Sequence, residues 1–555
     1  MNKIILLLFY PFFILYSNEW GKLIHYYDNQ NQITSSEFFL SSSTNPTPKQ
    51  ELTSTINLLN SKYLEKIACN FPARYSYLKN NNYDIPDFNL DKCEELNLFI
   101  KSFNKKYVSI VFSSEYTNNP SSAFGHTMLL FSNNLNSIEI GDTIHFAAKT
   151  SKTDGFIKYS YKGFSGKYNG YFIREPFFKK IYEYNTLEQR HMYIYTLDFS
   201  EKEISRLLYH LFEIRKATFK YYFLNGNCST QIIDLLNIAT NKKRDQTTYF
   251  LPIDAVQTYS SNIKNISKLT PLSNKLDYLI NKMSNSEKKI FNDVILTNNK
   301  ISVDTPDIVK EALSYYSTFN FRRFHRVFKN YENIMTQKYT PTKIVDKTPN
   351  PLDRTKPSYY GLGYYKSYNK NYFLLNYRPL FLDLQDIQLN NMQESEIKTL
   401  SLNLLFSNNS IKLKKLDFVN IKSLPIQTNF HKPISWSIYS GLTRENKENN
   451  LKFNNEFGIG RTIDLYKNLN FSFLLNVGLE NIDPYVKPSV RFSKYLSNNI
   501  KVGVSSYFKQ YNKDEYFENE IFTSIKNDNI LYTLNYINDK SLDINKYMFT
   551  VKYNF

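Results

Sequence analysis

The chain has 555 residues and 42% of them are hydrophobic, which excludes a disordered polymer and leaves room for several cores. Its formal net charge is +18, but the lysines and arginines are spread along the sequence and no nucleic-acid-binding motif accompanies them. We therefore expect no nucleic-acid partner and interpret the charge as a weak sign of an anionic membrane surface. The 46 tyrosines suit a surface between lipid and water, although a genome that favours tyrosine explains them equally well.

The N-terminus has the pattern of a cleavable secretion signal. Lys3 precedes an apolar run from Ile4 to Tyr16, which is too short to anchor the chain in a bilayer as a helix. We predict a signal peptide at residues 1–17 and, because no cysteine stands near its end, no lipid-modified N-terminus. No later run approaches about 18 apolar residues, so the sequence predicts no transmembrane helix.

The chain contains three cysteines, which matters in an exported protein. Cys69 and Cys93 flank a short loop-like segment, and a disulfide between them would contribute about 3 kcal/mol to stability in an oxidising compartment. This pairing leaves Cys228 alone. An odd thiol in a secreted protein is either accidental or reactive.

Hydrophobic periodicity divides the rest of the chain into segments. Pro48 opens an amphipathic helical run, and Ser200 with Glu203 is a capping box that predicts a second helix. The predicted domains are an N-terminal helical segment 18–100, a catalytic domain 101–245 that begins with strands and loops, a helical region 246–338, a proline-rich linker 339–357 and a barrel 358–555.

Beyond Tyr359 the period changes to two, with apolar and polar residues alternating. The clearest runs are Ile434–Leu442, Phe471–Leu479 and Tyr547–Phe555. Such strands present a lipid-facing row and a polar inner row, and closure of the sheet removes edges that lipid cannot satisfy. We predict an antiparallel transmembrane β-barrel of about ten to twelve strands, whose final phenylalanine is typical of outer-membrane barrels. A soluble β-sandwich also alternates and is the alternative.

Two residues have the chemistry and the placement of a thiol-dependent site. His126 stands just inside a buried-type strand, and Cys228 follows the turn Asn225-Gly226-Asn227 and opens a helix. A helix N-terminus stabilises a thiolate, and an imidazole nearby accepts the thiol proton. The simpler reading of each residue alone is a hydrogen-bonded structural histidine and an inert buried cysteine.

The order of these residues, with His before Cys, resembles that of circularly permuted NlpC/P60-like thiol enzymes. The segments Ser122-Ala123-Phe124-Gly125-His126-Thr127 and Asn227-Cys228-Ser229-Thr230 resemble the two hallmark segments of the Lnb-type lipoprotein N-acyltransferase periplasmic domain. A third segment, Cys69–Tyr75, is similar to an upstream part of that family, and the resemblance covers about residues 45–240. It implies an α+β, permuted papain-like domain with helical additions, a Cys228 nucleophile and a His126 base.

A third group should orient the imidazole of His126. In papain-like folds this group comes from the strand after the histidine strand, which here is Ile138–Phe146. His145 and Asp142 are the candidates, and we prefer His145 because its alternation phase places it beside His126. We expect no cofactor and no metal: His126, His145 and Cys228 could be three zinc ligands, but no closely spaced ligand pair exists.

The sequence thus predicts an outer-membrane protein whose catalytic domain lies in the periplasm. The resemblance implies transfer of an acyl chain from a lipid, through a thioester, to a lipoprotein amine, with a membrane lipid or lipoprotein as partner. A hydrolase would use the same thioester. Two alternatives stay open, namely a cell-wall peptide amidase or peptidase that uses the same dyad, and a non-enzymatic barrel with a degenerate periplasmic domain.

Overall fold

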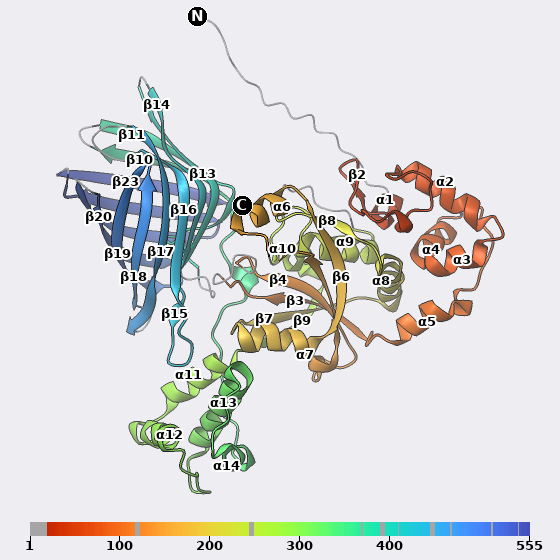
Figure 1. Ribbon diagram of the computed structural model, residues 1–555, viewed down its shortest axis with the longest axis horizontal. Helices are drawn as coiled ribbons and strands as arrows, with labels where there is room; N and C mark the ends of the chain where they lie inside the picture. Colours follow the sequence, from red (N-terminus) through yellow and green to blue (C-terminus); the bar gives the residue numbers. More distant parts are fainter. Residues whose placement is uncertain are drawn as a thin grey trace, which may run out of the picture. The chain divides into compact units, whose positions relative to one another are not determined.

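The computed structural model describes residues 19–116, 123–151, 153–242, 249–367, 370–388, 394–408, 410–444, 450–466, 469–511, 514–541 and 543–555. The predicted signal peptide, residues 1–17, lies outside the described residues. The chain forms two compact units (Figure 1). The first runs to Ser113 and continues with residues 125–184 and 192–269, and the second comprises residues 114–124, 185–191 and 270–555.

A seven-stranded antiparallel sheet organises the first unit, in the order β8-β6-β5-β4-β3-β7-β9. Its strands are β3 (Tyr107–Ser113), β4 (His126–Ser132), β5 (Asp142–Ala148), β6 (Tyr168–Pro176), β7 (Met192–Leu197), β8 (Phe219–Tyr221) and β9 (Ile263–Leu269), and β1 (Tyr26–Tyr27) pairs with β2 (Gln30–Asn31) apart from it. The sheet therefore extends through β9 into the stretch 246–338, which the sequence predicted to be helical.

Helices cover both faces of this sheet, with α8 and α9 on one side and α7 on the other (Figure 1). The helices are α1 (Glu19–Leu23), α2 (Pro48–Leu59), α3 (Leu64–Asn70), α4 (Pro72–Asn80), α5 (Glu94–Lys101), α6 (Phe156–Phe164), α7 (Phe177–Lys180), α8 (Glu201–Ile214), α9 (Cys228–Thr240) and α10 (Asp254–Thr258), with 3-10 turns η1 (Ser36–Phe38), η2 (Leu90–Lys92), η4 (Ile138–Ile140) and η6 (Ser260–Asn262) and the π-helix η5 (Ile181–Leu187). Among the described residues, no helix is long and apolar enough to cross a membrane.

Two predicted helix starts have the expected caps. Thr47 and Gln50 form a capping box at the start of α2, and Ser200 and Glu203 form another at the start of α8. The helices α6 and α7 lie in a stretch that the sequence predicted as strands and loops. Packing decides in favour of helix at α6, because Gly163 lets the helix lie directly against the ring of Phe223.

The segment Cys69–Tyr75 holds the N-terminal helices together. A disulfide joins Cys69 to Cys93, and Cys93 packs against Phe212 of α8. Arg74 is fully buried, lies over the ring of Phe38 and forms ion pairs with Glu51 at 2.7 Å and with Glu213 at 3.6 Å. A buried cation of this kind is tolerated only because acids surround it, so this part of the resemblance has a structural role.

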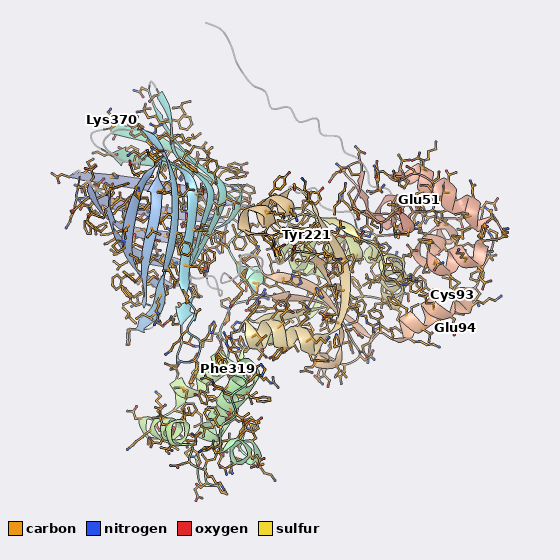
Figure 2. The ribbon with its side chains drawn as sticks, in the orientation of Figure 1. Glu51, Cys93, Glu94, Tyr221, Phe319 and Lys370 are labelled. Atoms are coloured by element: carbon orange, nitrogen blue, oxygen red, sulfur yellow. A yellow bond between two sulfur atoms is a disulfide. The ribbon has the colours of Figure 1, made fainter. Side chains whose placement is uncertain are left out.

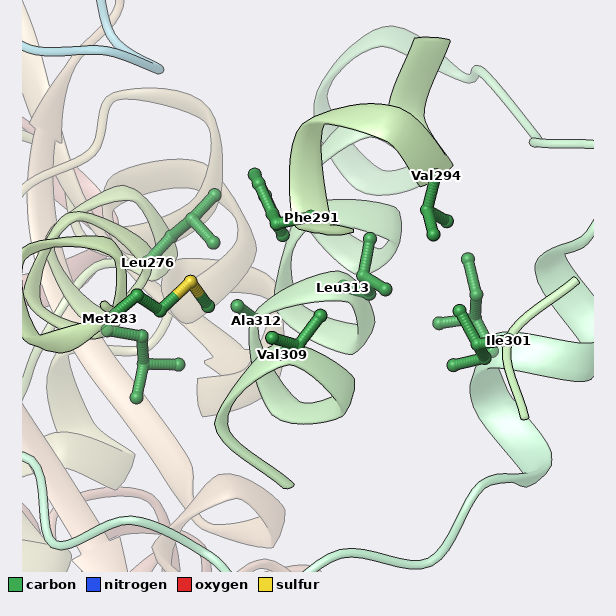
Figure 3. Packing of buried hydrophobic residues seen from close by; sticks show 10 residues of the cluster. Leu276, Met283, Phe291, Val294, Ile301, Val309, Ala312 and Leu313 are labelled. Carbon is green, nitrogen blue, oxygen red and sulfur yellow. The ribbon is translucent and has the colours of Figure 1, made fainter. Parts of the chain in front are cut away.

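The second unit contains a helical bundle that has its own core. Its helices are α11 (Leu272–Lys282), α12 (Asn285–Thr297), α13 (Asp307–Phe324) and α14 (Tyr331–Thr336). Leu276, Phe291, Val309 and Leu313 pack together between them (Figure 3). The stretch 339–357, predicted as a linker, is irregular apart from the 3-10 turn η7 (Pro351–Asp353).

The chain then forms a closed antiparallel barrel, which Figure 1 shows as a ring of strands. The described residues form a ring of twelve strands: β10 (Tyr359–Ser367), β11 (Lys370–Arg378), β13 (Ser395–Ser407), β14 (Ser410–Ser423), β16 (Ser435–Arg444), β17 (Leu451–Tyr466), β18 (Leu469–Glu480), β19 (Asp483–Ser497), β20 (Ile500–Gln510), β21 (Glu515–Asn527), β22 (Ile530–Asp539) and β23 (Ile544–Asn554). Pairing of β10 with β23 and of β11 with β13 completes the circle. The short strands β12 (Leu380–Leu382) and β15 (Ile426–Gln427) attach to β13 and β17. The predicted barrel is confirmed, and closure excludes the β-sandwich.

The barrel is apolar outside and polar inside. On β18, Phe473, Leu475 and Val477 point outward and are 41–50% exposed, whereas Ser472 and Asn476 face the lumen and are buried. Exposing a continuous apolar surface to water is unfavourable, whereas the hydrocarbon layer of a membrane accommodates it. The geometry is that of a membrane barrel.

A charge on the outer face should destabilise the barrel in lipid. Leu475 lies at the middle of β18 and faces outward. We expect Leu475→Arg to lower the free energy of unfolding by about 2–4 kcal/mol, because the guanidinium must enter the hydrocarbon layer. Urea unfolding in lipid vesicles measures this, with Asn498→Arg at an exposed turn as the control. Equal effects of both variants would contradict a lipid-facing β18.

Candidate functional site

The pairing of β4 with β5 brings two of the predicted site residues together. Met128 pairs with His145, so their side chains share a face of the sheet, and His126, two residues before Met128, shares it too. The ring centroids of His126 and His145 are 5.9 Å apart, in an edge-to-face arrangement. The ring of Tyr184 lies 5.7 Å from His126 on the same face, which α7 covers.

His145 is buried and held by an acid. Its Nε2 lies 3.3 Å from Oε2 of Glu175, and the Lys180 ammonium lies 3.0 Å from the same oxygen. Burial, aided by the positive charge of Lys180, lowers the pKa of His145 to about 4, against the opposing effect of Glu175. At neutral pH His145 is therefore an uncharged imidazole, which suits a group that orients a neighbour.

Asp142, the other candidate, does not reach His126. It pairs with Phe131 at the far end of β5 and therefore points to the opposite face from His145. Its carboxylate forms an ion pair with Arg174 at 3.0 Å. The structure thus places His145 beside His126 and gives Asp142 a different partner.

Cys228 is the first residue of α9, as the sequence predicts, and is 6% exposed. Asn227 caps this helix, since its Oδ1 accepts hydrogen bonds from the N–H groups of Ser229 and Thr230 at 2.9 and 3.2 Å. Gly226 takes φ +123°, which L-residues rarely adopt, and so permits the tight turn into the helix. A thirteen-residue helix directs its dipole at the sulfur, which favours the thiolate.

One segment contacts both parts of the site. The Thr127 hydroxyl donates a hydrogen bond to the carbonyl of Pro252, and the Asn227 amide donates to the carbonyl of Phe250 at 2.6 Å. The residue after His126 and the residue before Cys228 are therefore fixed to the same three-residue stretch. In addition, α9 packs against β4 and β5. These contacts hold the start of β4 and the start of α9 to one stretch of the chain.

The Cys228 thiol nevertheless lies on the opposite face of the sheet from the His126 imidazole. Tyr221 (labelled in Figure 2) stacks on Phe146, which follows His145 and so points to the opposite face. Burial raises the pKa of the Tyr221 phenol, and the charge of a Cys228 thiolate raises it further. Cys228 thus lies on the Tyr221 face, whereas His126, the half-buried first residue of β4, projects from the other face.

Sequence reasoning did not find Tyr184, Glu175, Lys180 or the stretch Phe250–Pro252. Tyr221 belongs to a run that the sequence placed before the turn, but without a role. Ser122, in the first resembling segment, lies outside the described residues. In the part of the chain that the structure describes, no group of three His, Cys, Asp or Glu side chains is arranged to hold a metal ion.

Family models match three parts of the chain. Residues 95–262 match the Lnb N-terminal periplasmic domain, which confirms the resemblance that the sequence motifs indicate. Residues 14–81 and 348–521 match two domains of unknown function, DUF7843 and DUF7840. No curated protein is detectably similar to this chain. The barrel and the periplasmic domain together identify an outer-membrane protein with a periplasmic domain.

Solved structures similar to the chain include outer-membrane barrels. The KdgM porin in complex with disordered oligogalacturonate is 9% identical, covering 36% of this chain and 99% of its own, with a TM-score of 0.24. The NanC porin is 8% identical over 35% of this chain and 100% of its own, with the same TM-score. The outer membrane protein Omp33 of Acinetobacter baumannii is 10% identical over 36% and 99%, also at 0.24. Likeness at this level carries no argument about function.

The neutral state of His145 can be measured directly. With ¹³C-labelled histidine, we expect its Cε1 resonance to titrate with a midpoint of about pH 4, because burial penalises the imidazolium. Lys180→Met should move the midpoint upward and Glu175→Gln should move it downward. Loss of one resonance in His145→Asn assigns the signal. A midpoint near the ordinary 6.5 would contradict the buried environment.

Proposed function

We propose that the periplasmic domain is a permuted papain-like thiol enzyme, in which Cys228 takes an acyl chain from a lipid as a thioester. The acyl chain is then transferred to an amine, such as that of a lipoprotein, or to water. The observation that supports this proposal is the tie of Thr127 and Asn227 to one stretch, Phe250–Pro252, since these two residues adjoin His126 and Cys228 in the sequence.

The residues divide the chemistry between them. His126 accepts the proton of the Cys228 thiol as the sulfur attacks the ester carbonyl of the donor. The tetrahedral intermediate collapses with cleavage of the C–O bond, and the His126 imidazolium gives its proton to the leaving alcohol. An amine or water then attacks the thioester, with His126 again as the base, and the C–S bond breaks to regenerate the thiol.

His145 acts through His126 as a positioning residue. Its uncharged ring packs edge-to-face on His126 and is fixed in turn by Glu175, which limits the rotation of both imidazoles. The oxyanion of the intermediate needs donors other than Ser229 and Thr230, because the Asn227 cap already uses their N–H groups. The apolar outer surface of the barrel keeps the domain at a membrane, where acyl donors are concentrated.

Substitutions of Cys228 and His126 should affect acyl transfer to different extents, because one residue is the proposed nucleophile and the other the proposed base. We expect Cys228→Ala to abolish acyl transfer and His126→Ala to reduce its rate about 10²- to 10⁴-fold, because the thiol then loses its general base. The rate of release of a labelled fatty acyl chain from phospholipid measures both. His325→Asn is the matched control, since His325 is exposed and its left-handed backbone conformation suits asparagine. Full activity of a folded Cys228→Ala variant would refute the proposal.

The intermediate should be visible by intact-protein mass spectrometry after incubation with phospholipid vesicles. We expect one acyl adduct, removed by hydroxylamine and mapped to Cys228, because Cys69 and Cys93 are held in a disulfide. Labelled muropeptide offered in parallel distinguishes the cell-wall alternative. Turnover of the muropeptide without any lipid adduct would favour a peptidase or amidase and overturn the acyl-transfer proposal.

A further inference from the structure

The chain leaves the barrel wall immediately after β12. Phe381, in the middle of that strand, is fully buried and takes φ +146°, a strained backbone conformation for a bulky residue. Surrounding contacts must hold such a residue in place. The following residues, 383–388, form what we call the plug segment, and most of them are buried although they belong to no strand.

Ion pairs join the two acids of the plug segment to strands of the barrel wall. Asp386 forms an ion pair with Arg378 at the end of β11, and both side chains are fully buried. Asp383 forms an ion pair with Lys398 of β13 at 2.8 Å and lies 3.9 Å from Lys552 of β23. Each acid of the segment therefore has a basic partner from the barrel wall, as buried charges require.

The same segment also contacts strands on other parts of the circumference. The carbonyl of Leu384 accepts hydrogen bonds from Arg491 of β19 at 3.1 Å and from Lys501 of β20 at 2.9 Å. The Leu384 side chain packs in a cluster with Leu474 of β18.

Two glutamines extend these contacts. Gln385 donates to Glu520 of β21 at 3.0 Å. The backbone of Gln388 exchanges two hydrogen bonds with the Tyr495 hydroxyl of β19. A six-residue segment that touches β11, β13, β18, β19, β20, β21 and β23 must cross the interior of the barrel.

Charged side chains line the space that remains beside the plug segment. A cavity of about 430 Å³ lies along it, and its wall carries basic and acidic side chains together. Many of them are paired, including Lys415 with Asp417 at 3.0 Å. Paired charges offer no field of one sign to draw an ion through.

We propose that residues 383–388 plug the barrel, so that it anchors the protein in the membrane and does not conduct solutes. This inference does not depend on the enzyme activity proposed above. It follows from the contacts inside the barrel alone, and it assigns the barrel the role of a membrane anchor.

Electrical recordings on the full chain in planar bilayers test this proposal. We expect the wild-type protein to insert without steady conductance. Arg378→Ala and Asp386→Ala each remove the same buried ion pair and should raise the frequency of open events at least about tenfold. Lys370→Ala, in an exposed position at the start of β11 (Figure 2), should leave the barrel closed. A heat-dependent shift in gel migration checks that each barrel is folded.

Replacement of residues 383–388 by a glycine–serine segment of equal length provides the strongest variant, with a stable open conductance as the expected result. Steady ohmic conductance of the wild type would overturn the proposal. Absence of conductance in the folded glycine–serine variant would overturn it as well, because the side chains of the barrel wall would then close the lumen by themselves. Silence of both Arg378→Ala and Asp386→Ala would show that the ion pair does not hold the plug.

Discussion

The antiparallel register between β4 and β5 is the constraint on which the candidate site depends. Because Met128 stands opposite His145, the side chains of His126 and His145 share one face. A slip of one residue would turn His145 away and bring Ile144 or Phe146 to its place. Burial of Met128 with Phe177 and Tyr184 on one face, and of Phe131 with Phe103 on the other, opposes such a slip. The hydrophobic core of the sheet therefore also fixes the geometry of the imidazoles.

A second constraint separates the thiol from the imidazoles. The helix that begins with Cys228 lies on the side of Tyr221 and Phe146, whereas His126 projects from the other face at the very start of its strand. In the proposed mechanism they meet at the end of the sheet, where Thr127 and Asn227 are fixed to the same stretch, Phe250–Pro252.

Local signals predicted much of this from the sequence. The Asn-Cys helix start, the capping box at Ser200 and the period-two alternation of the barrel depend on neighbouring residues, and the structure has them where the sequence places them. The partners of the site could not be found in that way. Glu175 reaches His145 through the β5–β6 pairing, and Tyr184 reaches His126 from a π-helix, so neither leaves a pattern in the sequence.

The plug segment and α6 could not be predicted either, because their contacts also come from residues that are distant in the sequence. Residues 383–388 have no periodicity, and their partners are distributed over seven strands that are distant in sequence. The helix α6 lies in a stretch that the sequence predicts as strands and loops, and its contact with Phe223 at Gly163 leaves no local pattern. Alternation alone favours His145 over Asp142, and the observed pairing places His145, and not Asp142, beside His126.

The proposed contact between His126 and Cys228 is tested most directly by the pH dependence of thiol alkylation. Rates for a small electrophile, such as iodoacetamide, measured from pH 4 to 10, report the fraction of thiolate at Cys228, since the other cysteines form a disulfide. The account predicts a wild-type rate that stays high well below the ordinary thiol pKa of about 8.5, and a His126→Ala profile that moves toward that value. Identical profiles for the two proteins, with a midpoint at or above about 8.5, would contradict it.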